Sequence, residues 1–128
     1  MKKVAFICNH NSCRSQIAEA FGKSLAGEHF ESYSAGTIIK DSINPDAVRL
    51  MKEHYGIDME LTQRPKQYAE IPVPDVAISM GCDVGCPFIG RAFDDNWGLP
   101  DPSGKDDEEF LRIIEQIRSN VLELIDKI

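Results

Sequence analysis

The first 26 residues constrain the fold most, because they follow the pattern of a buried strand, a polar loop and a helix. Residues 3–8 form an apolar run without polar alternation, as expected for a central parallel strand buried on both faces. The polar stretch Asn9–Ser15 comes next, and Gly27 is well placed to end the helix that follows. That helix has apolar residues at helical spacing: Ile17, Ala20, Phe21 and Leu25. This order of elements predicts an α/β fold.

The rest of the chain continues to alternate between strands and helices. Further strands are predicted at residues 30–34, 75–79 and 91–93. One helix should run from Asn44-Pro45 to Gly56, and a longer one from about Asp106. The longer helix has one apolar face, made of Phe110, Ile113, Ile114, Ile117, Val121, Leu124 and Ile128. No repeat or long linker interrupts this order, so residues 1–128 are expected to form one domain.

Charge and composition exclude several classes of function. The 14 basic and 21 acidic residues give a net charge of −7, which disfavours binding to nucleic acid or to anionic membranes. The longest apolar run, Val4–Cys8, is too short for a membrane span or a signal peptide, so we expect a cytoplasmic protein. In a reducing compartment, its four cysteines are more often catalytic or metal-binding than structural.

Cys8 and Arg14 bracket the polar loop between the first strand and its helix. Backbone N–H groups in such a loop, at a helix N-terminus, can surround a tetrahedral oxyanion, and Arg14 can add a bidentate donor. The same field favours the thiolate of Cys8, which becomes a candidate nucleophile. The predicted oxyanion loop comprises Asn9, His10, Asn11, Ser12, Cys13, Arg14 and Ser15. The alternative is a buried cysteine and a surface arginine on an ordinary turn.

Asp101 is the candidate proton donor. It lies between Pro100 and Pro102, in a rigid loop just before the last helix. A carboxyl group placed there could protonate a leaving oxygen. Its alternative role is turn formation only.

Cys82 and Cys86 follow the third predicted strand and should lie at the same sheet edge as Cys8. They could close a redox disulfide, helped by flexible glycines. Zinc bound by Cys8, Cys13, Cys82 and Cys86 is the alternative, but neither cysteine pair has the usual two-residue spacing. We therefore predict no metal, and we expect Cys13 to be a packed side chain that points away from the ligand.

The remaining histidines and the tryptophan suggest less chemistry. His10, His29 and His54 lack ligand spacing, although His10 could tune the anion loop. Trp97 is interpreted as a packing anchor.

The loop Cys8-Asn9-His10-Asn11-Ser12-Cys13-Arg14-Ser15 resembles that of the low-molecular-weight tyrosine phosphatase superfamily, and within it the thioredoxin-coupled arsenate reductases. The resemblance spans most of the chain. It includes Tyr33-Ser34-Ala35-Gly36, Asn44-Pro45, the strand before Cys82, and Trp97-Gly98 leading to Asp101-Pro102. It implies a three-layer sandwich in which helices flank a four-stranded parallel sheet.

The resemblance also implies a reaction. Cys8 would attack arsenate, Arg14 and the loop amides would hold its oxygens, and Asp101 would protonate the leaving hydroxide. Cys82 would then attack Cys8 to release arsenite, and Cys86 would resolve the resulting disulfide to Cys82–Cys86. Thioredoxin, or another thiol such as glutaredoxin, would reduce that pair, giving arsenic detoxification by a monomer without a tightly bound cofactor.

Two further features bear on this assignment. Some family members bind potassium through a carboxylate in the segment that matches Thr62-Gln63-Arg64, but Arg64 stands there, so potassium is not predicted. The main rival is a tyrosine phosphatase, which would use Cys8, Arg14 and Asp101 in the same way. Such phosphatases usually carry tyrosines after Asp-Pro, whereas Ser103-Gly104 follow here, and this favours the reductase. A zinc-binding or oxyanion-binding module without turnover is the remaining alternative.

Overall fold

A computed structural model describes residues 1–81 and 89–128. Its elements, in chain order, are β1 (Lys2–Ile7), α1 (Arg14–Ala26), β2 (Phe30–Ala35), α2 (Pro45–Tyr55), two short 3-10 helices η1 (Met59–Leu61) and η2 (Tyr68–Glu70), β3 (Val76–Ser79), β4 (Asp95–Asn96) and α3 (Asp107–Lys127). Among these residues, no helix is both long and apolar enough to cross a membrane.

The four strands form one parallel sheet in the order β2-β1-β3-β4. This confirms the predicted α/β fold with a four-stranded parallel sheet. β1 lies centrally between β2 and β3, and its residues from Val4 onward are fully buried, as its continuous apolar run predicts. The carboxyl end of β1 therefore opens at the sheet edge where ligands bind in this class of fold.

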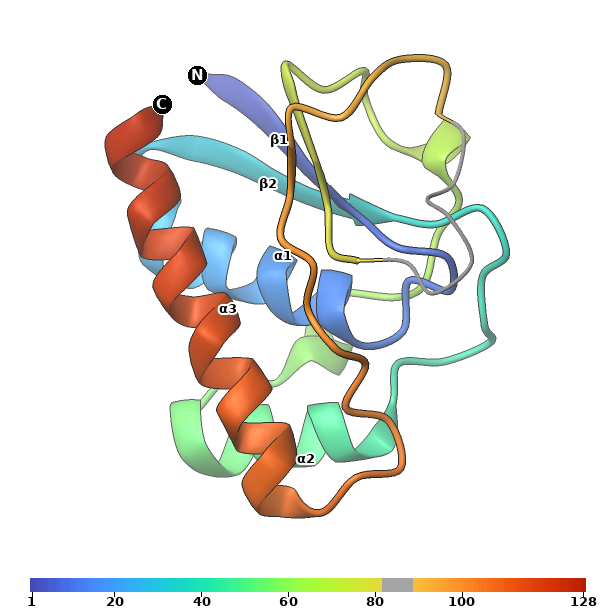
Figure 1. Cartoon of the computed structure of the whole chain (residues 1–128), viewed down its shortest axis with the longest axis vertical. Helices are drawn as coiled ribbons and strands as arrows, with labels where there is room; N and C mark the ends of the chain where they lie inside the picture. Colours follow the sequence, from blue (N-terminus) through green and yellow to red (C-terminus); the bar gives the residue numbers. More distant parts are fainter. Residues whose placement is uncertain (82–88) are drawn as a thin grey trace.

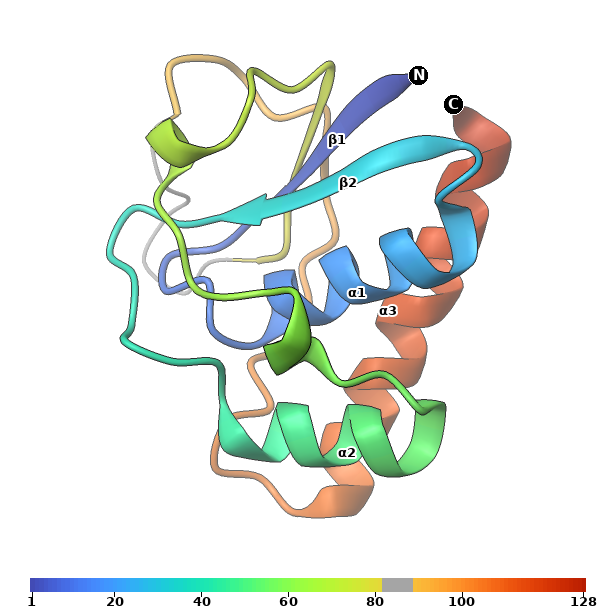
Figure 2. The ribbon, with the colours of Figure 1, turned by 180° about the vertical axis from the view of Figure 1, so that it is seen from behind.

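The two faces of the sheet are covered differently. Helices α1, α2 and α3 share one large core with Val4 and Phe6 of β1 (Figures 1 and 2). On the other face, Ala5 and Ile7 pack in a smaller cluster to which η2 contributes Tyr68. Among the described residues, the third layer therefore consists of a short helix and loops, and the long helices all lie on one side.

The fourth strand lies further along the chain than the sequence predicts. Residues 91–93 do not pair; β4 is Asp95–Asn96, opposite Ile78 and Ser79. The reason is the segment just before it. The Asp94 backbone N–H donates to the Ala77 carbonyl, and the Asp94 side chain accepts from the Ala77 N–H. Arg91 donates to the Asp94 carboxylate and to the Pro74 carbonyl.

The helix ends agree with the sequence signals. The Asn44 side chain accepts hydrogen bonds from the N–H groups of Asp46 and Ala47, and Gly56 ends α2 in the left-handed conformation. The Asp106 side chain caps α3. The predicted apolar face of α3 is buried at Phe110, Ile113, Ile114, Ile117, Val121 and Leu124.

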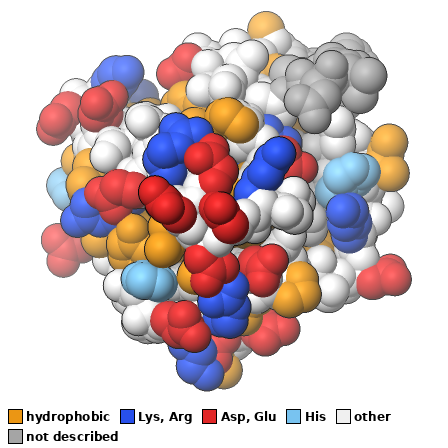
Figure 3. Space-filling view, turned by 60° about the horizontal axis from the view of Figure 1, so that its bottom comes forward, with side chains coloured by type: hydrophobic (Ala, Val, Ile, Leu, Met, Phe, Trp, Pro, Cys, Tyr) orange, Lys and Arg blue, Asp and Glu red, His pale blue; other side chains and the backbone are white. Residues whose placement is uncertain are grey.

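Charged groups on the helices are largely paired with one another. Arg49 of α2 makes two hydrogen bonds to Asp107 at the start of α3. Acidic and basic side chains lie intermixed on the face shown in Figure 3. Because exposed pairs of this kind contribute little each, the buried core accounts for most of the packing of α2 against α3.

Candidate active site

The predicted oxyanion loop connects the end of β1 to the start of α1. Cys8 and Arg14, at its two ends, are 5% and 9% exposed. The chain turns sharply at Asn11, whose φ of 49° is unusual for a residue with a side chain. Cys8 and Arg14 are both buried, which argues against the alternative of a surface arginine on an ordinary turn.

The carbonyl groups of this loop are bound by the segment that follows β2. Asn9 O accepts from the N–H groups of Thr37 and Ile38, and His10 O accepts from that of Lys40. Ser12 O accepts from the N–H of Asn44. In contrast, the N–H groups of residues 9–13 have no acceptor among the residues that the structure describes. Asn11, Ser12 and Cys13 are buried, and buried N–H groups normally have partners, so this arrangement fits an anion-binding loop.

Gly36 allows the segment that follows β2 to approach the oxyanion loop. A Cβ atom at this position would lie 2.5 Å from Asn9 O and 2.7 Å from Cys8 O. Only glycine therefore fits without moving the backbone of the loop.

Ser15 links the Cys8 sulfur to the rest of the loop. Its hydroxyl oxygen accepts a hydrogen bond from Asn11 Nδ2 at 2.8 Å and lies 2.9 Å from Cys8 Sγ. Because the oxygen already accepts from Asn11, its own hydrogen is free to point at the sulfur. A donated hydrogen bond stabilises the thiolate over the thiol.

The side chain of Asn11 is held in one orientation. Its Oδ1 accepts from Gln16 Nε2 at 2.9 Å and from the Lys66 N–H at 2.9 Å. Gln16 in turn accepts from Gln63 Nε2. With the oxygen held by two donors, the amide nitrogen must face Ser15.

A buried ion pair lies behind this network. The Lys66 ammonium is 2.8 Å from a Glu19 carboxylate oxygen and also contacts the Ser34 hydroxyl and the Arg64 carbonyl. Burial raises the pKa of Glu19, but the charge of Lys66 and hydrogen bonds from Lys23, Lys66 and Ser34 outweigh it and hold the pKa below its ordinary value. The Lys66 ammonium thus neutralises the buried Glu19 carboxylate beside the loop.

Replacing Lys66 with methionine should destabilise the protein by about 3 kcal/mol at neutral pH, because it leaves the Glu19 carboxylate buried without its main partner. Lys23→Met is the matched control. Lys23 binds the same carboxylate from a 41% exposed position, so its loss should cost less than about 1 kcal/mol. The depressed pKa of Glu19 means that its stabilising contribution is present above the ordinary carboxyl pKa and is lost as the pH falls. Urea unfolding at pH 7 measures both variants, and equal costs would contradict this assignment.

Arg14 is anchored by a segment far along the chain. Its Nη1 donates to the Leu99 carbonyl at 2.5 Å, while the Leu99 N–H donates to Met80 O. The guanidinium is thus fixed in the site, and its remaining N–H groups have no partner among the described residues. They are the donors that the sequence assigns to an oxyanion.

Asp101 lies within electrostatic reach of Arg14, as a proton donor for the site must. Its Oδ1 accepts from the Ser103 N–H at 3.0 Å, so it also forms the turn considered as its alternative role. Burial raises the pKa of Asp101, yet the hydrogen bonds from Ser103 and the charges of Arg14 and Lys40 outweigh burial and hold the pKa below its ordinary value. The free site therefore contains a carboxylate at neutral pH.

Cys13 agrees with its interpretation as a packed side chain. It is 5% exposed. Burial, together with the negative charges of Asp101 and Cys8, raises the pKa of the Cys13 thiol far above its usual range. It is therefore not a second nucleophile at neutral pH.

The other predicted site residues have varied positions. His10 is exposed and its Nδ1 lies 2.8 Å from Ile38 O. Trp97 packs with its ring 5.4 Å from that of Phe6, which confirms the packing anchor. Cys82 and Cys86 lie outside the described residues. Within residues 1–81 and 89–128, no group of three His, Cys, Asp or Glu side chains could hold a metal ion.

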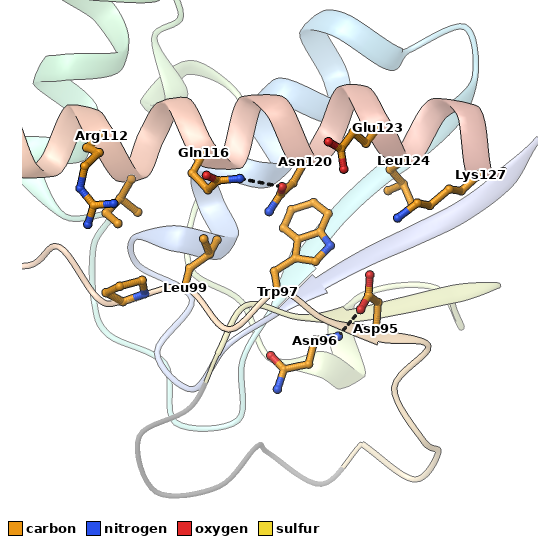
Figure 4. A pocket seen from close by; sticks show the side chains of 12 residues that line it. Asp95, Asn96, Trp97, Leu99, Arg112, Gln116, Asn120, Glu123, Leu124 and Lys127 are labelled. Carbon is orange, nitrogen blue, oxygen red and sulfur yellow. Dashed lines mark hydrogen bonds between the residues drawn. The ribbon is translucent and has the colours of Figure 1, made fainter.

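A hollow of about 480 Å³ lies elsewhere, between α3 and the segment around Trp97 (Figure 4). Figure 4 shows the Gln116 and Asn120 amides bonded to each other above the indole ring. Neither Cys8 nor Arg14 lines this hollow. The hollow adjoins the predicted anion site through Leu99, whose carbonyl accepts from Arg14.

Comparison with known proteins identifies the family. The profile of the low molecular weight phosphotyrosine protein phosphatase family matches residues 3–128, and the chain belongs to this family. Within the family, the chain is similar to arsenate reductases and, at 25% identity, to a low molecular weight protein tyrosine phosphatase from T. tengcongensis. It is 37% identical to arsenate reductase 1 of Staphylococcus epidermidis, over 94% of this chain and 92% of that protein.

Solved structures agree with this placement. An arsenate reductase in the phosphate binding state has a TM-score of 0.84 and 35% identity, covering 100% of this chain and 99% of that one. The thioredoxin-dependent arsenate reductase Cg_ArsC1' of Corynebacterium glutamicum has a TM-score of 0.75 and 31% identity, covering 99% of this chain and 61% of that one. The resemblance inferred from the loop and the Asp-Pro motif is thus confirmed.

Proposed function

We propose that this chain reduces arsenate to arsenite, with Cys8 as the nucleophile and thioredoxin as the external reductant. The observation that carries the proposal is the loop of unpartnered N–H groups between Cys8 and Arg14. Such a loop binds a tetrahedral oxyanion next to a thiolate. The similarity to arsenate reductases, one of them thioredoxin-dependent, supports the choice of arsenate and of thioredoxin.

The first step joins the Cys8 sulfur to arsenic. Arg14 and the loop N–H groups bind the arsenate oxygens, and the thiolate attacks As(V). As the S–As bond forms, one As–O bond breaks, and Asp101 donates a proton so that the oxygen leaves as water. Ser15 holds the thiolate until it attacks.

Reduction takes place in the second step. The Cys82 thiolate attacks the Cys8 sulfur, forming an S–S bond while the S–As bond breaks and its electron pair passes to arsenic. As(V) becomes As(III), and two thiols are oxidised to one disulfide. Cys86 then attacks Cys82, which frees Cys8 and leaves a Cys82–Cys86 disulfide that thioredoxin reduces.

The first step requires Asp101 to be protonated, although its pKa is depressed in the free site. The negative charge of bound arsenate opposes the effects of Arg14 and Lys40, so Asp101 should take up a proton as the complex forms. Asp101 can therefore act as the proton donor only if it takes up a proton when arsenate binds.

Asp101→Asn is expected to lower the rate of arsenite formation by roughly 10²-fold or more, because it removes the proton donor. An asparagine Oδ1 can still accept from the Ser103 N–H, so the turn should persist. Quenched-flow single-turnover measurements between pH 5 and 8 give the rate of arsenite formation. A variant rate within threefold of wild type across this range would exclude Asp101 as the donor.

A single-turnover experiment tests the function as a whole. Fully reduced protein is mixed with arsenate without external reductant, arsenite is measured, and the cysteines are mapped by mass spectrometry. About one arsenite per chain together with a Cys82–Cys86 disulfide is expected. Four free thiols and no arsenite would refute the reductase.

A tyrosine phosphatase is the second candidate, favoured by the family and by the shared use of Cys8, Arg14 and Asp101. Ser103 occupies the position after Asp-Pro where these phosphatases usually carry a tyrosine, and it contacts Asn44 and Asp101 instead. Hydrolysis of an aryl phosphate by protein that forms no arsenite would support this candidate.

A further inference from the structure

Most basic side chains of this acidic chain already have acidic partners. Among the described residues, ion pairs hold Lys3, Lys23, Arg49, Lys52, Arg64, Lys66, Arg91, Arg112 and Arg118. Lys66, although near the oxyanion loop, is committed to Glu19. A substrate that carries negative charge therefore meets few free cations, on a protein whose net charge is −7.

Lys40 is one of the free cations, and it lies beside the anion site. Its side chain is exposed and forms no ion pair with the part of the chain that the structure describes. Its backbone N–H donates to His10 O at 3.1 Å, which fixes the segment against the oxyanion loop. Lys40 also borders a hollow of about 470 Å³ together with Ser12 of that loop.

The electrostatics of Asp101 agree with this position of Lys40 beside the loop. The charge of Lys40 lowers the pKa of Asp101, as does that of Arg14. Arg14 and Lys40, from distant parts of the chain, thus both act on Asp101. Arg14 is buried and bonded to Leu99, whereas Lys40 is exposed and can meet a ligand in solvent.

Asp41 borders the same hollow and carries the opposite charge. No ion pair joins Asp41 to Lys40 among the residues that the structure describes. The ammonium is therefore not neutralised by direct contact with its neighbour, and its field extends toward the loop and Asp101.

We propose that Lys40 is the capture residue of the anion site, attracting small doubly charged tetrahedral oxyanions and raising their occupancy of the Cys8 loop. This inference rests on the proposed function, in that it takes the Cys8 loop as the oxyanion site and arsenate as the substrate. Lys40 acts before the chemical steps and donates no proton. Charge attraction of this kind weakens as salt is added, because exposed charges are screened.

Lys40→Gln tests this role, with inorganic phosphate as the probe because it binds without being reduced. At low ionic strength, the variant should bind phosphate about fivefold more weakly, and the difference should fall below about twofold in 0.5 M salt. Its KM for arsenate should rise by a similar factor at low salt. Its kcat should not fall by more than about twofold, because loss of the Lys40 charge favours the protonated form of Asp101 that the first step uses. Lys40→Arg should restore wild-type binding.

Lys127→Gln is the matched control, since it makes the same change in net charge at an exposed position. Lys127 is the last residue of α3, whose end lies at the same end of the molecule as the N-terminus, whereas the oxyanion loop follows the other end of β1 (Figures 1 and 2). Phosphate affinity unchanged in Lys40→Gln, or lowered equally in Lys127→Gln, would overturn the proposal. Weaker phosphate binding in a protein that forms no arsenite would uphold Lys40 and refute the reductase.

Discussion

Cys8→Ser is expected to abolish arsenate reduction, with a loss of roughly 10⁴-fold or more. A serine hydroxyl at neutral pH is not ionised as a thiolate can be, so it is a far weaker nucleophile. Even if it attacked arsenic, its oxygen could not form the disulfide that returns an electron pair to the metalloid. Both steps fail for separate reasons. Any phosphatase activity should disappear as well.

The control for Cys8→Ser is Cys13→Ser, in the same loop. Cys13 is equally buried, but its pKa is raised, so it is not expected to act as a nucleophile. Its replacement should lower the rate by less than about tenfold, through packing alone. Phosphate binding by Cys8→Ser should persist and show that the loop is folded. Arsenite formation by Cys8→Ser at more than about 1% of the wild-type rate would exclude Cys8 as the nucleophile.

The site was predictable where its residues are close in sequence. Cys8, the polar loop and Arg14 lie within one strand-loop-helix unit, so strand burial and helix position alone place them together. Asp101 was predictable as a rigid loop residue. The lowering of its pKa comes from hydrogen bonds of nearby Ser103 and from the charges of Arg14 and Lys40. Because Arg14 and Lys40 belong to other segments, their part in this shift could not be predicted from the sequence.

The support of the loop was not predictable, because it comes from distant segments. Asn11 is oriented by the main chain of Lys66, and Gln16 by Gln63. The available signal was the presence of Gln16 and Glu19 next to the apolar residues of the predicted helix. Buried polar side chains need partners, but the sequence pattern does not name them.

The position of the fourth strand was predicted wrongly, also because contacts with distant segments determine it. Residues 91–93 have the composition of a strand, yet pairing with β3 begins at Asp95. Long-range contacts of Arg91 and Asp94 determine where the edge strand starts. Local propensity is easily overridden at a sheet edge by such contacts.

The disulfide relay makes a second large prediction, which concerns turnover. Cys86→Ser should still release about one arsenite per chain, because Cys82 can attack the Cys8 sulfur. The reaction should then stop with a Cys8–Cys82 disulfide, and multiple turnover with thioredoxin should fall by roughly 10²-fold or more. Arsenite counted per chain, with disulfides mapped after alkylation, measures both effects.

Cys82→Ser is the matched variant, and it separates the two thiols by the step at which each acts. Without Cys82, no thiol of the relay attacks the Cys8–arsenic adduct, so the arsenite burst itself should be lost. A burst in Cys86→Ser and none in Cys82→Ser would assign attack on Cys8 to Cys82 and resolution to Cys86. Multiple turnover of Cys86→Ser, with thioredoxin as sole reductant, would instead mean that thioredoxin reaches the Cys8–Cys82 disulfide directly. The relay would then end at its second cysteine, and Cys86 would have no required part in the reduction.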